Sequence, residues 1–291
     1  MMRVLGCIFN QGSFTAPKVD MSDKTIVVTG PSIGGIGFET ALGLADFGAK
    51  VYLASRSIEK GEATAAAIRE KVPNAQVEVL RCDVSDLESV REMAAPLATK
   101  DKPAVDVLVS NAGSQSDTHS TNKEGVDMTF AACALGHHLL AHLLKPSRVV
   151  TVTGDIYCIA KGPADPFCKE IGTEAYARAC LGRLLLGSEM RKGTETHGKP
   201  EVIVVHPGVI ATNLMGATGI GKSIMNAAFL TPKAGAQASI FAASCPSSEI
   251  PEDAFYFHNK RRWVKLPPDD KASDSEAAKA LFDKCNTICG I

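Results

Sequence analysis

The 291-residue sequence has no apolar run close to the ~18 residues that a transmembrane helix needs, so no membrane span is predicted. Its net charge is −1, which removes any global electrostatic attraction to nucleic acid or to an anionic membrane. The N-terminus lacks the long apolar stretch of a secretory signal. Residues 1–22 are therefore expected to form a short extension before the first strand of a cytoplasmic protein, with a weak organelle-targeting segment as the alternative.

The cysteine pattern lacks the features of a disulfide scaffold. Nine cysteines are scattered along the chain, and an odd number in a chain of this size indicates reduced thiols in a reducing compartment. Cys285 and Cys289 lie four residues apart, but nothing near them completes a set of zinc ligands. We expect both to pack within a helix, and the sequence predicts no metal site.

What the sequence does contain is a regular alternation of two kinds of segment. Short runs rich in β-branched residues are typical of parallel strands buried on both faces, and segments of helical composition separate them. Helix-start signals support this, because Ser57 precedes one such segment and Ser85-Asp86-Leu87-Glu88 precedes another. The alternation predicts a single α/β domain over residues 23–291, built as a Rossmann-type doubly wound parallel sheet. The expected strands are Thr25–Thr29, Val51–Ala54, Val77–Leu80, Val105–Val109, Val149–Val152 and Val202–Val205, and the expected helices are Gly37–Phe47, Glu59–Lys71, Asp86–Ala98, Glu124–Leu144 and Glu174–Arg191.

Two irregular segments, residues 154–172 and 208–231, follow predicted strands. Ligands bind at the carboxyl ends of the strands in open α/β sheets, and long loops there often cover a substrate. Met215, Ile220 and Phe229 make the second segment apolar. It is predicted to be a substrate lid, with core packing as the alternative.

A glycine-rich turn follows the first predicted strand and opens the first helix. Glycines let the backbone approach a pyrophosphate, and the helix N-terminus adds N–H donors and the positive end of its dipole. The position at the first strand–helix junction makes the motif far more specific than a lone glycine pattern. The residues predicted to hold the phosphates are Gly30, Ser32, Gly34, Gly35, Ile36 and Gly37.

The end of the second strand indicates which nicotinamide cofactor is bound. An acidic residue there would bind the ribose 2′-hydroxyl of NAD, but Ser55 occupies the position and Arg56 follows it. A guanidinium suits a 2′-phosphate, so NADP(H) is the predicted cofactor. The alternative is that Arg56 only meets solvent.

Further motifs follow in order along the chain: Cys82-Asp83-Val84, Ser110-Asn111-Ala112-Gly113, Gly136-His137, Ala175-Tyr176, Pro207-Gly208-Val209, Thr212 and Leu230-Thr231-Pro232. Together with TGPSIGGIGFETA, which begins at Thr29, and Ser55-Arg56-Ser57, they span about Asp23 to Gly290. In these motifs and their order the sequence resembles the short-chain dehydrogenase/reductase family, in its retinol-dehydrogenase-like branch, which includes protochlorophyllide reductases.

The resemblance carries one departure in the phosphate loop. Four residues, rather than the family's three, separate Thr29-Gly30 from Gly35-Ile36-Gly37, and Pro31 removes one N–H donor. We expect the cradle to be retained because glycines can absorb the extra residue. The resemblance further implies that Asp83 and Val84 flank the adenine, that Asn111, Ala112 and Gly113 line the end of the fourth strand, and that Val209 and Thr212 approach the nicotinamide amide.

The family reduces carbonyls or oxidises alcohols with an Asn-Ser-Tyr-Lys set, in which the tyrosine is the general acid/base. By resemblance Tyr176 is that tyrosine, whereas Cys180, Gly154 and Cys133 stand at the Lys, Ser and Asn positions. A tyrosine with no cationic neighbour has a pKa near ~10, so only about one part in a thousand is ionised at pH 7. Alcohol oxidation therefore loses more than carbonyl reduction, in which neutral Tyr176 donates a proton.

Two candidates could replace the missing polar groups. Asp155 follows Gly154 and is predicted to assist Tyr176. Tyr157 and Lys161 form a second Y-x-x-x-K pair, which shares one face only if the segment is helical. The glycine and proline that follow Lys161 argue against a helix, so this pair is the weaker candidate.

The remaining candidates have simpler explanations. His137 could supply a proton, although a packing role is favoured. Cys133, Cys158 and Cys180 could line one cavity and, with a histidine, bind a metal or sense redox state. Small apolar thiols that fill the space left by Asn and Lys are the favoured interpretation.

The sequence thus favours an NADP(H)-binding oxidoreductase with weakened catalysis that acts on a hydrophobic carbonyl or alcohol. A non-catalytic binding or assembly subunit with the same fold is almost equally favoured, and a non-redox isomerase or cyclase ranks behind both. The expected partner is a small hydrophobic substrate or ligand, and a homo-oligomer or a larger assembly stays open.

Overall fold

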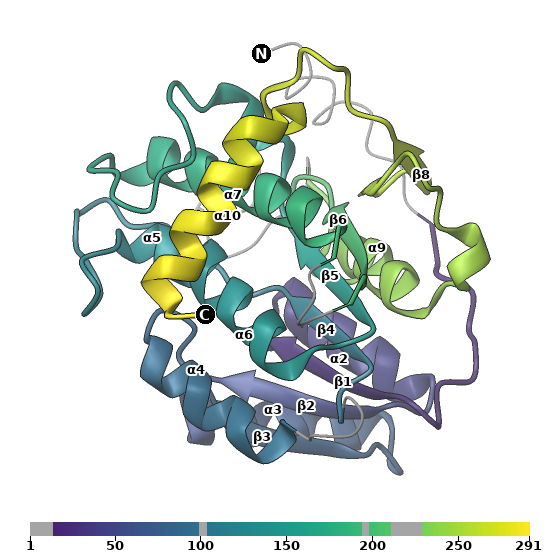
Figure 1. Ribbon diagram of the computed structural model, residues 1–291. Helices are drawn as coiled ribbons and strands as arrows, with labels where there is room; N and C mark the ends of the chain where they lie inside the picture. Colours follow the sequence, from purple (N-terminus) through teal and green to yellow (C-terminus); the bar gives the residue numbers. More distant parts are fainter. Residues whose placement is uncertain (1–13, 99–103, 194–197, 211–228) are drawn as a thin grey trace.

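The computed structural model describes residues 14–98, 104–193, 198–210 and 229–291, around one eight-stranded sheet (Figure 1). The strand order is β3-β2-β1-β4-β5-β6-β7-β8. Neighbouring strands are parallel except β7 and β8, which pair antiparallel at the edge. This is the Rossmann-type doubly wound fold that the sequence predicts. The strands are β1 Thr25–Thr29, β2 Lys50–Ser55, β3 Val77–Arg81, β4 Val107–Ser110, β5 Arg148–Val152, β6 Glu201–His206, β7 Tyr256–His258 and β8 Arg262–Val264.

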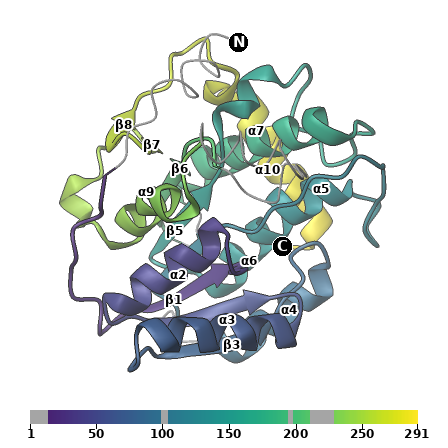
Figure 2. The same cartoon turned by 180° about the vertical axis from the view of Figure 1, so that it is seen from behind.

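Helices cover both faces of the sheet, as the views from the two sides show (Figures 1 and 2). On one face α2, α3 and α9 enclose a core that includes Leu44, Ile68 and Phe241. On the other face α4, α6, α7 and α10 enclose a second core that includes Leu139 and Leu184. The helices are α2 Ile36–Asp46, α3 Ile58–Lys71, α4 Leu87–Ala94, α5 Met128–Phe130, α6 Gly136–Leu144, α7 Gly172–Met190, α9 Pro232–Ser244 and α10 Ser275–Cys289.

Most predicted elements are confirmed within a few residues. Ser57 and Asp86 are N-caps whose side chains accept hydrogen bonds from the first turns of α3 and α4. Cys285 and Cys289 are buried in α10, as expected for packing residues. The sequence did not predict β7 and β8, because runs of three residues are too short to show a period. Among the described helices, none is both long and apolar enough to cross a membrane.

The part of the N-terminal extension that the structure describes packs against the sheet. The ring of Phe14 lies 6.0 Å, centroid to centroid, from the rings of both Phe241 and Phe257. The backbone N–H of Ala16 donates to the Gln237 side-chain oxygen at 2.9 Å. Residues 14–22 therefore cover α9 and β7 and complete the core on that face.

The register of the parallel strands brings their carboxyl ends to one edge. Ser110 at the end of β4 pairs with Thr151, and Val152 at the end of β5 pairs with Val205. His206 at the end of β6 pairs with His258 at the end of β7. The segments that leave these strands therefore lie together, where open α/β sheets bind their ligands.

A buried arginine joins the opposite edge of the sheet to α9. Arg148 forms an ion pair with Glu201 at 2.6 Å and is only 8% exposed. Its Nη1 also donates to the carbonyl oxygens of Ala242, Ala243 and Cys245, at the end of α9. These are the carbonyls that a helix leaves without internal partners, and a cation there also meets the negative end of the helix dipole.

Arg148→Met is expected to lower the free energy of unfolding by about 3 kcal/mol, because buried carbonyls and Glu201 lose their donor. Urea denaturation measures the loss. The matched control is Lys50→Met, which removes the more exposed ion pair between Lys50 and Glu78 and should cost no more than about 1 kcal/mol. Equal losses in the two variants would show that the bonds to α9 contribute little.

Candidate active site at the carboxyl edge of the sheet

The glycine-rich loop between β1 and α2 has the geometry of a phosphate cradle. Gly30 and Gly34 have φ values of +63° and +79°, which side-chain-bearing residues rarely adopt. Gly35 is the N-cap of α2 and has no side chain to occupy the first N–H groups of the helix. A Cβ atom at Gly37 would lie 2.5 Å from the Gly30 carbonyl oxygen and from the Asn111 amide nitrogen, so only glycine fits.

The extra residue of this loop is accommodated by a local turn. The Gly35 N–H donates to the Ser32 carbonyl oxygen at 3.0 Å. Pro31 is buried, whereas Ser32 is exposed, and Ile36 begins α2. The longer loop therefore keeps the N-terminus of α2 open toward the edge of the sheet.

Asn111 and Ala112 are tied to this loop through Thr29. The Thr29 Oγ1 accepts hydrogen bonds from the backbone N–H groups of Asn111 and Ala112 at 2.9 and 3.0 Å. The Asn111 side-chain amide donates to the carbonyl oxygens of Thr29 and Gly30 at 2.9 and 3.2 Å. Together with Gly113, these residues form the end of β4 beside the cradle, where the resemblance expected them.

His137 is a tether between two parts of the site. Its Nε2 lies 2.9 Å from Thr29 Oγ1, and its Nδ1 lies 3.0 Å from the Cys133 carbonyl oxygen. Burial, followed by the charge of Arg183, lowers the pKa of His137 to about 3. A neutral imidazole that donates from Nδ1 and accepts at Nε2 satisfies both bonds. This geometry supports packing and positioning over proton supply.

Arg56 lies exposed just beyond the end of β2. None of the described ion pairs or hydrogen bonds involves its guanidinium, so its donors face solvent. Asp83 follows β3, and its carboxylate accepts hydrogen bonds from the Ser85 N–H and hydroxyl at 3.0 and 2.6 Å. Val84 beside it is 9% exposed. These residues flank the edge on the side of the cradle.

Tyr176 lies on α7 next to two thiols. The adjacent Cys180, burial of the ring and Cys133 raise the pKa of Tyr176 well above its ordinary value, and the charge of Arg183 opposes this rise. Burial raises the pKa of Cys180 to about 11 and also raises the pKa of Cys133, so both thiols are neutral at pH 7. The phenol is therefore a protonated acid in neutral solution.

Arg183 is the part of the site that the sequence analysis missed. It is 4% exposed, and its Nε donates to the Cys133 carbonyl oxygen at 2.5 Å. Its two terminal nitrogens donate to the carbonyl oxygens of Val152 and Ala112. The signal for it was present in the sequence, because Arg183 is the only charge between Ala179 and Gly187 of a buried helix.

Cys133 lies in η2 Ala131–Leu135, a π-helical turn between α5 and α6. Its thiol donates to the Ser114 carbonyl oxygen at 3.4 Å. Such turns free a carbonyl from the regular helix pattern, and here that carbonyl binds both Arg183 and His137. By the resemblance Cys133 stands at the position of the family's Asn. Its side chain differs, but its backbone carbonyl still takes part in the site.

The described contacts of Asp155 are with residues of β7. It begins the short 3-10 helix η3 Asp155–Ile159, and its Oδ1 accepts a hydrogen bond of 2.5 Å from the Tyr256 hydroxyl. Its Oδ2 lies 3.8 Å from His258 Nε2. No described contact joins Asp155 to Tyr176, so its predicted assistance to that tyrosine gains no support from geometry.

The second Y-x-x-x-K pair is not assembled. The Tyr157 hydroxyl donates to the Asp270 carboxylate at 3.0 Å, and the ring is fully buried. Lys161 is exposed in the bend beyond η3. Cys158 is half-buried and packs against the core that contains Cys133 and Cys180.

Val209 and Ile210 lead out of β6 toward the predicted lid. Ile210 forms an isolated parallel bridge with Leu230, and the Leu230 N–H donates to the Val209 carbonyl oxygen at 3.0 Å. Thr212 and most of the predicted lid, residues 211–228, lie outside the described residues. The two ends of the segment are therefore fixed beside each other at the edge of the sheet.

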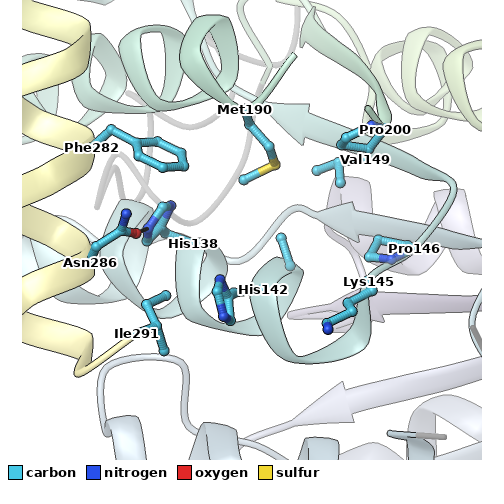
Figure 3. A pocket seen from close by; sticks show the side chains of 11 residues that line it. His138, His142, Lys145, Pro146, Val149, Met190, Pro200, Phe282, Asn286 and Ile291 are labelled. Carbon is cyan, nitrogen blue, oxygen red and sulfur yellow. Dashed lines mark hydrogen bonds between the residues drawn. The ribbon is translucent and has the colours of Figure 1, made fainter. Parts of the chain in front are cut away.

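An apolar pocket of about 190 Å³ lies far from this edge (Figure 3). It opens between α6, α7 and α10, beside Pro146, Val149 and Pro200 at the amino ends of β5 and β6. Inside it, His138 Nε2 lies 2.7 Å from the Asn286 side-chain oxygen. Because it meets the opposite edge of the sheet, the pocket is not part of the site described above.

The fold and this edge define a dinucleotide-binding α/β protein of the Rossmann type. A sequence model of the family described as short chain dehydrogenase matches residues 24–223. The chain is 30% identical to retinol dehydrogenase 12 of Homo sapiens, with 97% of this chain and 92% of that protein covered. It is 31% identical to retinol dehydrogenase 13 of Mus musculus, covering 96% and 88%.

Solved structures show the same fold. A crystal structure of an uncharacterised protein from Mycobacterium paratuberculosis is 27% identical, with a TM-score of 0.75 and coverage of 96% of this chain and 98% of the other. A metagenomic short-chain oxidoreductase in complex with NADP is 23% identical, with a TM-score of 0.57 and coverage of 79% and 95%. The chain therefore belongs to the short-chain dehydrogenase/reductase family, in its retinol-dehydrogenase-like branch.

Tyr176 is expected to stay protonated up to about pH 10, because its pKa is raised above the ordinary phenol value. The measurement is the tyrosinate absorbance of the wild type minus that of Tyr176→Phe during an alkaline titration. Cys180→Ala removes the largest cause of the shift and should lower the pKa of Tyr176. Folding raises the pKa of Tyr176, so this residue stabilises the folded protein at pH values below its pKa in the unfolded chain. That stabilisation is lost as the pH rises through its pKa in the folded protein. A tyrosinate signal from Tyr176 near neutral pH would contradict this assignment.

Proposed function

We propose that the protein is an NADP(H)-dependent oxidoreductase that acts on a hydrophobic carbonyl or alcohol and works best in the direction of carbonyl reduction. The observation that carries the proposal is a protonated Tyr176 next to the buried Arg183, whose guanidinium donates to the Ala112 carbonyl oxygen beside the phosphate cradle. Tyr176, Cys180 and Arg183 are spaced i, i+4 and i+7, so they share one face of α7. That face meets the carboxyl ends of β4 and β5 through the Arg183 hydrogen bonds.

The cofactor preference rests on the end of β2. Ser55 stands where an acidic residue would bind the ribose 2′-hydroxyl of NAD, so no carboxylate is present there. Its hydroxyl donates instead to the Ser57 carbonyl oxygen at 2.9 Å. The neighbouring Arg56 is an exposed guanidinium with no described acidic partner, which suits a 2′-phosphate. When bound, NADPH would supply the hydride, with its pyrophosphate at Gly34, Gly35 and the N-terminus of α2.

Tyr176 is the proposed proton donor. In reduction the carbonyl carbon gains a hydride, and the carbonyl oxygen takes the phenolic proton, which solvent later replaces. A phenol with a raised pKa stays protonated and available for this step, whereas its phenolate is costly to form. Arg183 offsets part of that cost, because its positive charge favours the phenolate. Alcohol oxidation requires the phenolate from the start, and the raised pKa of Tyr176 leaves little of it in neutral solution despite Arg183.

A hydrophobic substrate is proposed from the relatives and from the segment 208–231. The relatives reported above are named retinol dehydrogenases, and retinol is an apolar alcohol. In this sequence the segment that follows β6 carries Met215, Ile220 and Phe229. Met215 and Ile220 lie outside the described residues, so it is the apolar composition of the segment that supports an apolar substrate.

A second candidate is a nucleotide-binding protein that performs no chemistry. It is favoured by the buried, neutral thiols of Cys133 and Cys180 and by Gly154, which leave the usual Asn, Lys and Ser functions unfilled. The cradle geometry is the same under both candidates. Turnover, and not cofactor binding, separates them.

Arg56→Ala is expected to weaken NADPH binding by about 10- to 100-fold, because a charge-assisted bond to a phosphate contributes roughly 1.5–3 kcal/mol. NADH binding should stay unchanged, since NADH has no 2′-phosphate. Calorimetric titration measures both affinities. Lys71→Ala, which removes an exposed cation at the far end of α3, is the matched control and should leave NADPH binding intact. Equal NADPH binding by wild type and Arg56→Ala would refute the assignment to Arg56.

Gly154→Ser is expected to raise the rate of carbonyl reduction by about 100-fold, because it restores a hydroxyl donor to the developing oxyanion. Gly154 has φ −155°, and a Cβ there would have no neighbour closer than 3.8 Å, so serine fits without strain. Gly154→Ala adds the same Cβ without the hydroxyl and should leave the rate unchanged.

The assay follows NADPH consumption with a panel of apolar aldehydes, ketones and quinones. Tyr176→Phe should abolish turnover while NADPH still binds. Bound NADPH without turnover in both the wild type and Gly154→Ser would favour the non-catalytic candidate.

A further inference from the structure

Three buried side chains that the proposed reaction does not use meet at the carboxyl ends of β5, β6 and β7. Asp155 follows β5, His206 ends β6 and His258 ends β7. Their exposed fractions are 8%, 3% and 3%. His206 and His258 are direct partners in the register of their strands, so the sheet itself places the two rings together.

The donor atoms of these side chains converge on one point. One atom from each of Asp155, His206 and His258 lies within 4.8 Å of the other two. The two imidazole rings are 4.6 Å apart, centroid to centroid, with 57° between their planes. Among the described parts of the chain, no other set of His, Cys, Asp and Glu side chains has this arrangement.

His206 gives an independent reason to expect a ligand. Neither of its ring nitrogens forms a described hydrogen bond of normal geometry, although the ring is buried. A buried polar group without a partner is costly, and a neutral imidazole has the lone pair that a metal ion requires.

We propose that Asp155, His206 and His258 bind one divalent transition-metal ion of the Zn²⁺ class. Two imidazole nitrogens and one carboxylate oxygen match the three protein ligands of open zinc sites. Ligand bonds of roughly 2.0–2.2 Å would set the donors about 3.4 Å apart, so the side chains need to close by only ~1 Å around the ion. The carboxylate also offsets part of the charge of the ion in a buried place.

The surroundings of the cluster fit this assignment. The Tyr256 hydroxyl donates to Asp155 Oδ1 at 2.5 Å and leaves Oδ2 on the side of His258. Such an outer hydrogen bond orients a ligating carboxylate and tunes its affinity. Gly154 adds no side chain next to the cluster, and a Cβ there would lie 3.8 Å from His206 Nδ1. The missing side chain leaves room for a fourth ligand from water or a small oxygen-bearing molecule.

The test uses the full-length protein after dialysis against a chelator, with Co²⁺ and Zn²⁺ as probes. Co²⁺ should bind once per chain and produce visible d–d absorption without the near-ultraviolet band of a thiolate ligand. That band matters because the chain has nine cysteines. Zn²⁺ should compete with Co²⁺ and raise the melting temperature of the wild type.

His206→Gln and His258→Gln are each expected to weaken Zn²⁺ binding by at least about 100-fold, and Tyr256→Phe by about 10-fold. His119→Gln changes an exposed histidine and is the matched control, with unchanged affinity. The melting temperature of each variant without metal separates a lost ligand from a lost fold. Asp155→Asn removes the carboxylate but keeps an oxygen that accepts the Tyr256 hydrogen bond. It therefore tests the carboxylate ligand while this hydrogen bond is preserved.

The proposal is overturned if the wild type takes up no Co²⁺ or Zn²⁺. It is also overturned if stoichiometric binding survives in the folded ligand variants, or if it carries the thiolate band. None of these measurements involves NADPH or turnover. Metal binding and the proposed oxidoreductase function can therefore fail separately.

Discussion

The guanidinium of Arg183 connects the three backbone segments on which the site is built. It donates to the carbonyl oxygens of Ala112 beyond β4, Cys133 in the π-helical turn and Val152 at the end of β5. No described carboxylate pairs with this buried cation, so the carbonyl dipoles alone compensate its charge. Without Arg183, three carbonyl oxygens would lose this hydrogen-bond donor. Without these carbonyls, the guanidinium would be a buried charge that neither protein nor solvent compensates. The positions of Tyr176 and of the end of β4 depend on this balance.

The carboxyl edge of the sheet has two parts, and the extra residue beside Pro31 leaves the glycine geometry of the first part intact. The part formed by β1, β2 and β4 keeps its phosphate loop, and Thr29 and Asn111 lock that loop to the sheet. The part that faces α7 carries the neutral, buried thiols of Cys133 and Cys180 next to Tyr176. The proposed cofactor site and the proposed proton donor thus rest on different parts of the edge, joined by Arg183.

The sequence predicts those features whose physical cause is local. Buried parallel strands such as Thr25–Thr29 show as β-branched runs, and the cradle shows as glycines at one strand–helix junction. Arg183 was detectable only as a charge in an otherwise apolar helix, and its carbonyl partners come from segments far away in the chain. The cluster of Asp155, His206 and His258 could not be predicted, because three separate strand ends and their register create it.

Cys180 and Arg183 suit one another on the surface of α7. They are three residues apart on α7 and therefore neighbours on its surface. A lysine at position 180 would place a second cation beside a buried guanidinium, and like charges at such a separation repel by about 3–4 kcal/mol at an effective dielectric constant near 20. A small neutral thiol removes that repulsion and fills the space. In this chain the positive charge that acts on Tyr176 comes from Arg183, which also joins the backbone segments of the site.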